Sequence, residues 1–183
     1  MIEYVTKSEM KGFAKQLDVQ KRESLESRIA KTYRSDLTFL SHSSKDQDLV
    51  TGAIRVLTNH GASVYIDEID PEMPPYTSAE TAKTLKDRIS SSRKFVLLAT
   101  KNSQDSNWVP WELGIADGYK SIRNIALFPA IEDDGNSRWT NWEYMGLYHR
   151  IVWGEMKGRE KPLWMVLDER SFTATSLSEW LRR

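Results

Sequence analysis

The chain contains no cysteine among its 183 residues. This absence excludes disulfide bonds, thiolate catalysis and cysteine-ligated zinc, and it fits a reducing compartment. Histidine is scarce as well, and His42, His60 and His149 show none of the close spacings that histidine metal ligands use. The sequence therefore predicts a protein without a metal site.

Long apolar runs and an excess of one charge are also missing. No stretch approaches the roughly 18 apolar residues of a membrane span, and residues 1–10 lack the order of basic and apolar residues that marks a secretory signal. Lysine plus arginine number 26, as do aspartate plus glutamate, so a net charge of zero provides no field that attracts a polyanion. We expect a cytoplasmic protein that binds neither a membrane nor nucleic acid.

The composition that remains is that of a globular protein, with 39% hydrophobic and 28% charged residues. A chain of this length suits one domain with short extensions. Residues 1–35 predict an N-terminal helical extension, because Thr6 and Glu9 can form a capping box and apolar residues recur at helical spacing as far as Tyr33.

From residue 36 onward, short apolar runs alternate with amphipathic segments. The predicted strands are 37–40, 62–66, 95–99, 125–128, 149–153 and 163–167. The predicted helix boundaries are capping boxes at Ser44 with Gln47, Thr77 with Glu80 and Ser176 with Glu179, a start near Pro110, and an end at Gly61. This alternation predicts a flavodoxin-like α/β fold, a three-layer sandwich with a mainly parallel central sheet.

Ligands of such folds lie beyond the carboxyl ends of the strands. That rule selects three loops, 41–45, 67–77 and 100–108. The third loop leads to Trp108 and Glu112, which are four residues apart and share one face if a helix begins at Trp108. An aromatic plane and a carboxylate could then meet one ligand.

Each of these residues also has a purely structural interpretation. A glutamate near a helix start commonly complements the helix dipole, and a tryptophan at helical spacing commonly belongs to the core. Ser106 is read most simply as a helix N-cap, and the serines of 41–44 as a cap and turn. On pattern alone, a structural role for Glu112 is the commoner outcome.

A family resemblance changes that balance. The segments that show the resemblance are FLSHSSKD at 39–46, VYID at 64–67, FVLLATKNSQDSNWVPWEL at 95–113 and EYMGLYHRIV at 143–152. Together they resemble a Toll/interleukin-1 receptor (TIR) domain of the bacterial stand-alone type that cleaves NAD, similar to the TIR proteins of Thoeris-like antiphage defence. The resemblance covers 36–153, which leaves 154–183 as a C-terminal strand and helix extension packed on that domain.

The resemblance implies NAD as the substrate, no further cofactor, and Glu112 as the catalytic glutamate. It implies substrate-binding roles for Ser41, His42, Asp67, Ser106 and Trp108. One carboxylate could suffice, because nicotinamide leaves NAD as a neutral ring while the ribose becomes a cation that a carboxylate can stabilise. A stacked Trp108 would limit water, which matters for whether ADP-ribose or a cyclic or conjugated product forms.

Two other functions fit the same pattern. The first is a non-enzymatic interaction module that assembles with other TIR domains through the proline-rich loop, with Pro74 and Tyr76 at the contact. The second, a response-regulator receiver, is disfavoured because the strand 95–99 leads into Thr100 without a phosphoacceptor aspartate. Under the enzymatic interpretation we expect self-association and a separate effector protein that senses the nucleotide product.

Overall fold

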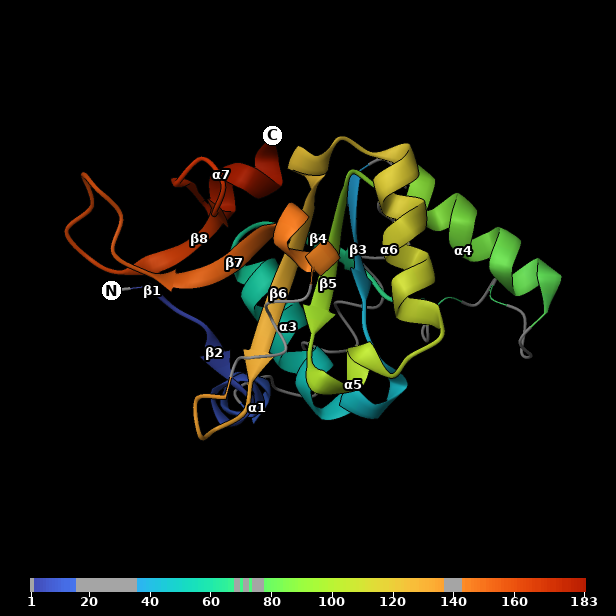
Figure 1. Cartoon of the computed structure of the whole chain (residues 1–183), viewed down its shortest axis with the longest axis horizontal. Coiled ribbons are helices and arrows are strands. Elements are labelled where there is room, and N and C mark those ends of the chain that lie inside the picture. Colours follow the sequence, from blue (N-terminus) through green and yellow to red (C-terminus); the bar gives the residue numbers. More distant parts are fainter. Residues whose placement is uncertain (1, 16–35, 68–69, 71–72, 74–77, 137–142) are drawn as a thin grey trace.

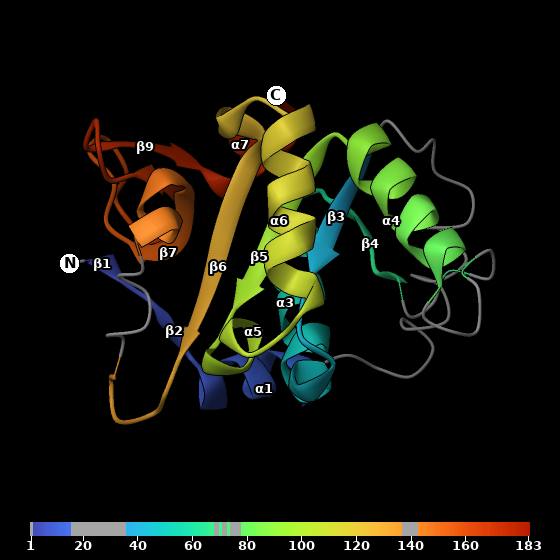
Figure 2. The same cartoon turned by 45° about the vertical axis from the view of Figure 1, so that its right-hand side comes forward.

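The computed structural model describes residues 2–15, 36–67, 70, 73, 78–136 and 143–183. One sheet runs through this part of the chain, with helices on both of its faces (Figures 1 and 2). Its strand order is β4-β3-β5-β6-β7-β8-β9, with β1 paired to β7 and β2 to β6. The predicted three-layer α/β fold is therefore confirmed. Within the described part, no helix is long and apolar enough to cross a membrane.

Five consecutive neighbours of the sheet pair in parallel. They are β4 (Ser63–Tyr65), β3 (Leu37–Ser41), β5 (Lys94–Ala99), β6 (Ile125–Ile131) and β7 (His149–Gly154). Every residue of β3, β5 and β6 is buried, as expected of parallel strands covered on both faces. The chain passes from β3 to β4 on one side and returns to β5 on the other, so a topological switch point lies between β3 and β5.

The helices divide between the two faces of the sheet. Helices α1 (Lys7–Lys15) and α3 (Gln47–Asn59) pack with the last helix, α7 (Leu177–Arg182), against one face. Helices α4 (Ala79–Ser91) and α6 (Trp108–Tyr119) pack against the other, as Figure 2 shows. Each face has its own cluster of buried apolar side chains.

Two of the predicted capping boxes form as expected or nearly so. The Thr6 amide donates to Glu9 Oε2 at 2.8 Å, while the Glu9 amide donates to Thr6 Oγ1 at 3.2 Å. At the start of α7, Ser176 accepts from the Glu179 amide at 3.4 Å. Gly61 follows the end of α3 with a φ of 99°, a backbone conformation that glycine adopts readily.

Two other caps differ from the prediction. The box of Ser44 with Gln47 is wrong, because Ser43 caps a 3₁₀ turn at Ser44–Asp46 and α3 follows directly from that turn. At α4 the reciprocal box joins Ser78 and Thr81 instead of residues one position earlier. Thr77 itself lies outside the described residues. Neighbouring serines and threonines compete for the same cap, so the sequence pattern does not decide between them.

The N-terminal segment is not helical from its start. Residues Ile2–Glu3 (β1) pair antiparallel with β7, and Val5–Thr6 (β2) pair parallel with β6, before α1 begins. The helical prediction is wrong for residues 2–6, because pairing with distant strands leaves no local periodicity. The remainder of that prediction, residues 16–35, lies outside the described residues. The division of the chain at residues 36 and 153 stays a prediction.

The C-terminal segment continues the sheet. Strand β8 (Leu163–Asp168) pairs antiparallel with β7, and β9 (Thr173–Ser176), which was not predicted, pairs with β8. Helix α7 is fixed by Trp180, whose indole N–H donates to the Arg123 carbonyl at 2.8 Å. The short, half-exposed β9 lacks the apolar alternation that would have indicated a strand.

Helix α1 approaches α3 closely at Gly52. A Cβ atom at position 52 would lie 2.1 Å from the carbonyl oxygen of Met10, which is fully buried. Because the obstructing atom belongs to the backbone, a side chain at this position would force the two helices apart.

We therefore expect Gly52→Ala to lower the free energy of unfolding by about 1–3 kcal/mol. The matched control is Gly114→Ala in α6, where an added Cβ meets nothing within 4 Å. Ala is the better helix former, so this control should gain about 0.5–1 kcal/mol. Chemical denaturation of both variants tests the contact. Equal stability changes would show that α1 does not pack on α3 through Gly52.

Candidate active site

A pocket of about 180 Å³ opens at the carboxyl end of β3. Its walls come from the loop after β3, from the end of β4 and from the facing sides of α4 and α6. The lining residues are His42, Ser44, Asp67, Thr81, Leu85, Ser106, Trp108 and Glu112. Five of the six predicted site residues therefore line one pocket, and the sixth, Ser41, lies directly beside it.

Glu112 lies in the second turn of α6, one turn after Trp108. Its side chain is only 5% exposed, and Ser41, the last residue of β3, is 1% exposed. The Ser41 hydroxyl donates a hydrogen bond of 2.5 Å to Glu112 Oε2. Burial argues against the interpretation of Glu112 as a solvated helix-dipole partner, because an unneeded carboxylate would be expected to face water.

The environment of Glu112 favours its neutral form. Burial raises the pKa of Glu112 to about 8; the Ser41 hydrogen bond acts in the opposite direction, and the negative charge of Asp67 adds to the rise. A carboxyl group that titrates near neutrality inside a cleft is a recognised mark of a functional site.

Ser106 both lines the pocket and caps the helix that carries Glu112. Its Oγ accepts hydrogen bonds from the amides of Trp108 and Val109, each at 3.3 Å. The N-cap position of α6 is Asn107, whose side chain makes no capping hydrogen bond, so the Ser106 hydroxyl supplies the cap from the position before it. The substrate-binding role of Ser106 stays a prediction.

Trp108 is held at the pocket by its own helix. Its ring packs edge-on against Trp111, with ring centroids 5.3 Å apart and planes at 82°. Trp108 also contacts the apolar cluster on this face of the sheet, so it is partly a core residue. Because it also lines the pocket, the structural and functional interpretations of Trp108 are compatible.

A buried aspartate that the sequence did not single out joins the two loops beside the pocket. Asp46, 1% exposed, accepts from the Thr100 hydroxyl at 2.5 Å and from the Asn102 amide at 2.7 Å. These bonds tie the turn after β3 to the segment after β5 and so fix the position of the loop that contains His42 and Ser44. The only sequence signal was the place of Asp46 at the end of FLSHSSKD.

A second buried network anchors the segment after β4. Asp70 Oδ2 accepts from Arg88 Nε and from the Tyr65 hydroxyl, each at 2.7 Å, and the Arg88–Asp70 ion pair is almost fully buried. This network holds the start of the proline-rich loop against α4. Pro74 and Tyr76 lie outside the described residues.

The pocket also includes two residues of α4, Thr81 and Leu85, that sequence reasoning missed. Neither follows a strand, so the rule that selected the loops could not select them. In the sequence, both residues are ordinary positions of an amphipathic helix. They reach the pocket because the fold packs α4 beside α6.

The strand order and the buried glutamate near the switch point define a flavodoxin-like α/β domain with a pocket that contains two acidic residues. Residues 38–162 match the model of the TIR domain. The chain belongs to the TIR domain family, and the receiver alternative is set aside.

Two curated proteins are similar to this chain in sequence. The chain is 29% identical over 148 residues to a protein of Bacillus cereus (strain MSX-D12) named "Probable 3' cyclic ADP-D-ribose synthase ThsB'", covering 79% of this chain and 75% of that protein. It is 33% identical over 114 residues to TIR2 of Cytobacillus dafuensis, which carries the provisional name cyclic ADP-D-ribose synthase. That match covers 61% of this chain and 29% of the relative.

Because the pKa of Glu112 is raised in the folded state, the stability of the protein should depend on pH. Since the folded-state pKa of Glu112 is raised to about 8, folding favours its protonated form, and the wild-type protein loses stability as the pH rises toward and through that value. The Glu112→Gln variant has no such titration. We expect the melting temperature of the variant, minus that of the wild type, to increase between about pH 5 and about pH 9. A difference that stays constant over this range would contradict the raised pKa.

Proposed function

We propose that this TIR domain cleaves the nicotinamide–ribose bond of NAD and releases ADP-ribose or a cyclic or conjugated ADP-ribose signal in antiviral defence. The observation that carries the proposal is the buried Glu112, held by Ser41 in a pocket that also contains Asp67 and Trp108. The names of the two relatives support the same chemistry. NAD is the substrate, and no further cofactor is part of the proposal.

The charges of the pocket suit the reacting half of NAD. The nicotinamide ring carries a positive charge before cleavage, and the ribose carries one in the transition state. Asp67 and Glu112 would attract both, and the arriving cation would lower the pKa of Glu112 and favour its carboxylate. The same carboxylate would then stabilise the oxocarbenium-like ribose, a differential electrostatic effect that accelerates bond cleavage.

The remaining pocket residues would bind the substrate in an orientation suited to cleavage. Trp108 offers an aromatic surface for a ring of the substrate and restricts the access of water. His42 and Ser106 add polar side chains to the lining of the pocket. Restricted water would favour attack by an internal nucleophile, which gives a cyclic product in place of ADP-ribose.

A volume of about 180 Å³ is smaller than the roughly 300–1,000 Å³ of pockets that enclose a whole drug-sized ligand. The pocket can therefore enclose only one end of a dinucleotide. Self-association of TIR domains near the proline-rich loop would supply a surface for the other end. A separate effector that senses the product, and a cytoplasmic location, complete the proposal.

We expect the wild-type protein, concentrated enough to self-associate, to release nicotinamide from NAD. Glu112→Gln should reduce that release by at least about a hundredfold, as removal of one main transition-state stabiliser does. The matched control is Asp117→Asn, an exposed carboxylate on the same helix, which should retain activity. Chromatographic assay of nicotinamide is the measurement. Equal activity in Glu112→Gln and wild type would remove Glu112 from the mechanism, whereas no nicotinamide release by the wild type would favour the non-enzymatic interaction module.

The pH dependence separates the roles of the neighbours of Glu112. Because the carboxylate is the active form, kcat/KM should rise with pH to a plateau above about 8. Ser41→Ala should move the midpoint upward, since the Ser41 hydrogen bond lowers the pKa of Glu112. Asp67→Asn should move it downward, since the charge of Asp67 raises that pKa. A midpoint that moves in neither variant would show that another group controls the profile.

A further inference from the structure

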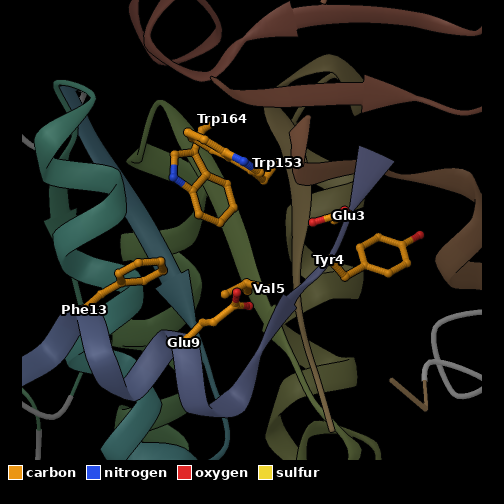
Figure 3. Close-up of a pocket in the computed structure, with 7 residues that line it drawn as sticks. All are labelled: Glu3, Tyr4, Val5, Glu9, Phe13, Trp153 and Trp164. Carbon is orange, nitrogen blue, oxygen red and sulfur yellow. The ribbon is translucent and has the colours of Figure 1, made fainter. Parts of the chain in front are cut away.

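A second pocket, of about 280 Å³, lies on the other face of the sheet from Glu112. It is bounded by α1 and the two short N-terminal strands on one side, and by β7 and β8 on the other (Figure 3). None of its lining residues belongs to the candidate active site, so its chemistry must be considered separately.

Three aromatic side chains form one wall of this pocket. The Trp153 and Trp164 rings meet with centroids 5.5 Å apart, and Phe13 meets Trp164 at 6.2 Å, in both cases edge to face. Trp153 is 39% exposed although it carries a large apolar ring. Figure 3 shows the two indoles and the Phe13 ring gathered around one space, whereas the Tyr4 ring points away from it.

Two carboxylates also line this pocket. Figure 3 shows the Glu9 carboxylate, close to Val5, directed toward the space between the rings, and Glu3 near Trp153, its partner in the pairing of β1 with β7. Glu9 is held in place because its Oε2 accepts from the Thr6 amide at 2.8 Å and from the Thr6 hydroxyl at 3.0 Å. The lining includes no lysine, arginine or histidine, and within the described part of the chain neither carboxylate forms an ion pair.

This combination of aromatic rings and carboxylates favours a positively charged ligand. Aromatic rings attract a positive group over their faces, and the two carboxylates add direct charge attraction. The same carboxylates repel phosphates, which makes the pocket unsuitable as a second site for NAD or for an ADP-ribose product. Its volume, just below that of pockets for drug-sized ligands, suits a group about as large as one long side chain.

We propose that this pocket binds a guanidinium group. A guanidinium is planar, stacks on aromatic rings and donates several N–H bonds in a fork that matches carboxylates, so it can use both walls at once. An ammonium group is a more strongly hydrated point charge and would use the aromatic wall less well. The guanidinium could belong to a small molecule or to an arginine side chain of a partner polypeptide.

The experiment titrates the full chain with N-acetyl-arginine amide and with N-acetyl-citrulline amide, which has the same shape without the charge. The indole N–H resonances of Trp153 and Trp164 report occupancy of this pocket, and NAD is absent throughout. We expect the arginine compound to shift both resonances saturably and the citrulline compound to bind at least fivefold more weakly. Equal binding of the two compounds, or no saturable shift, would overturn the proposal.

Variants then test the two walls. Glu3→Gln with Glu9→Gln should weaken arginine binding about three- to tenfold, and Glu9→Gln keeps a capping residue, because glutamine serves at this position of a capping box. Trp153→Leu should weaken it about two- to fivefold. The control is Glu160→Gln, an exposed carboxylate away from the pocket. Unchanged affinity in the double variant would overturn the role of the carboxylates.

A comparison of ligands separates the two sources. A Gly-Gly-Arg-Gly-Gly peptide that binds at least tenfold more tightly than the amide indicates an arginine presented by a polypeptide, because the additional backbone then contacts the rim. Equal affinities indicate a small guanidinium compound. Either result supports the proposal, whereas loss of binding when the arginine is placed in the peptide restricts the site to free ligands.

Discussion

The parallel pairing of β3 with β5 is the constraint on which the arrangement of this molecule depends. Ser41 is paired with Leu97 in that ladder, so the two strands end at the same edge of the sheet. Helix α6, the second helix after β5, then places Glu112 over the end of β3, within hydrogen-bond distance of a residue 71 positions earlier in the chain. No local property of either segment produces this contact. It follows from the crossover that carries the chain from one side of β3 to the other.

Burying a carboxyl group at this position is costly, and the surrounding residues reduce that cost only in part. The Ser41 hydroxyl satisfies one oxygen of Glu112, yet the pKa of Glu112 stays raised because desolvation dominates and Asp67 opposes ionisation. The nearby carboxylate of Asp46 has the contrasting arrangement, with hydrogen bonds from both Thr100 and Asn102. Both carboxylate oxygens of Asp46 thus accept hydrogen bonds that hold the two loops together. Glu112 accepts the Ser41 hydrogen bond at one oxygen, which leaves the other oxygen for a ligand.

The sheet also separates two pockets of unlike composition. On the face covered by α4 and α6, the pocket is mostly polar and ends on a buried glutamate. On the opposite face, the N-terminal strands and α1 close an aromatic pocket whose charged residues are all acidic. The second pocket exists because β1 and β2 extend the sheet beside β7 and β6, and this brings Glu3 and Glu9 next to Trp153 and Trp164. The net charge of zero over the whole chain gives no indication of the acidic residues gathered in each pocket.

The sequence alone determined the elements whose signal is local. The continuous apolar runs of β5 and β6, the helical periods and the caps at Thr6 and Ser176 were readable because burial on both faces and backbone capping leave a direct mark on residue type. Strand ends also located the loops that line the first pocket, and family resemblance gave Glu112 its expected role. Only the tertiary structure decided that Ser41 contacts Glu112, that Asp46 joins two loops, and that α4 contributes Thr81 and Leu85. It alone also showed that residues 2–3 and 5–6 form strands. Each of these depends on segments distant in the chain, and contacts of that kind leave no pattern in the sequence around either partner.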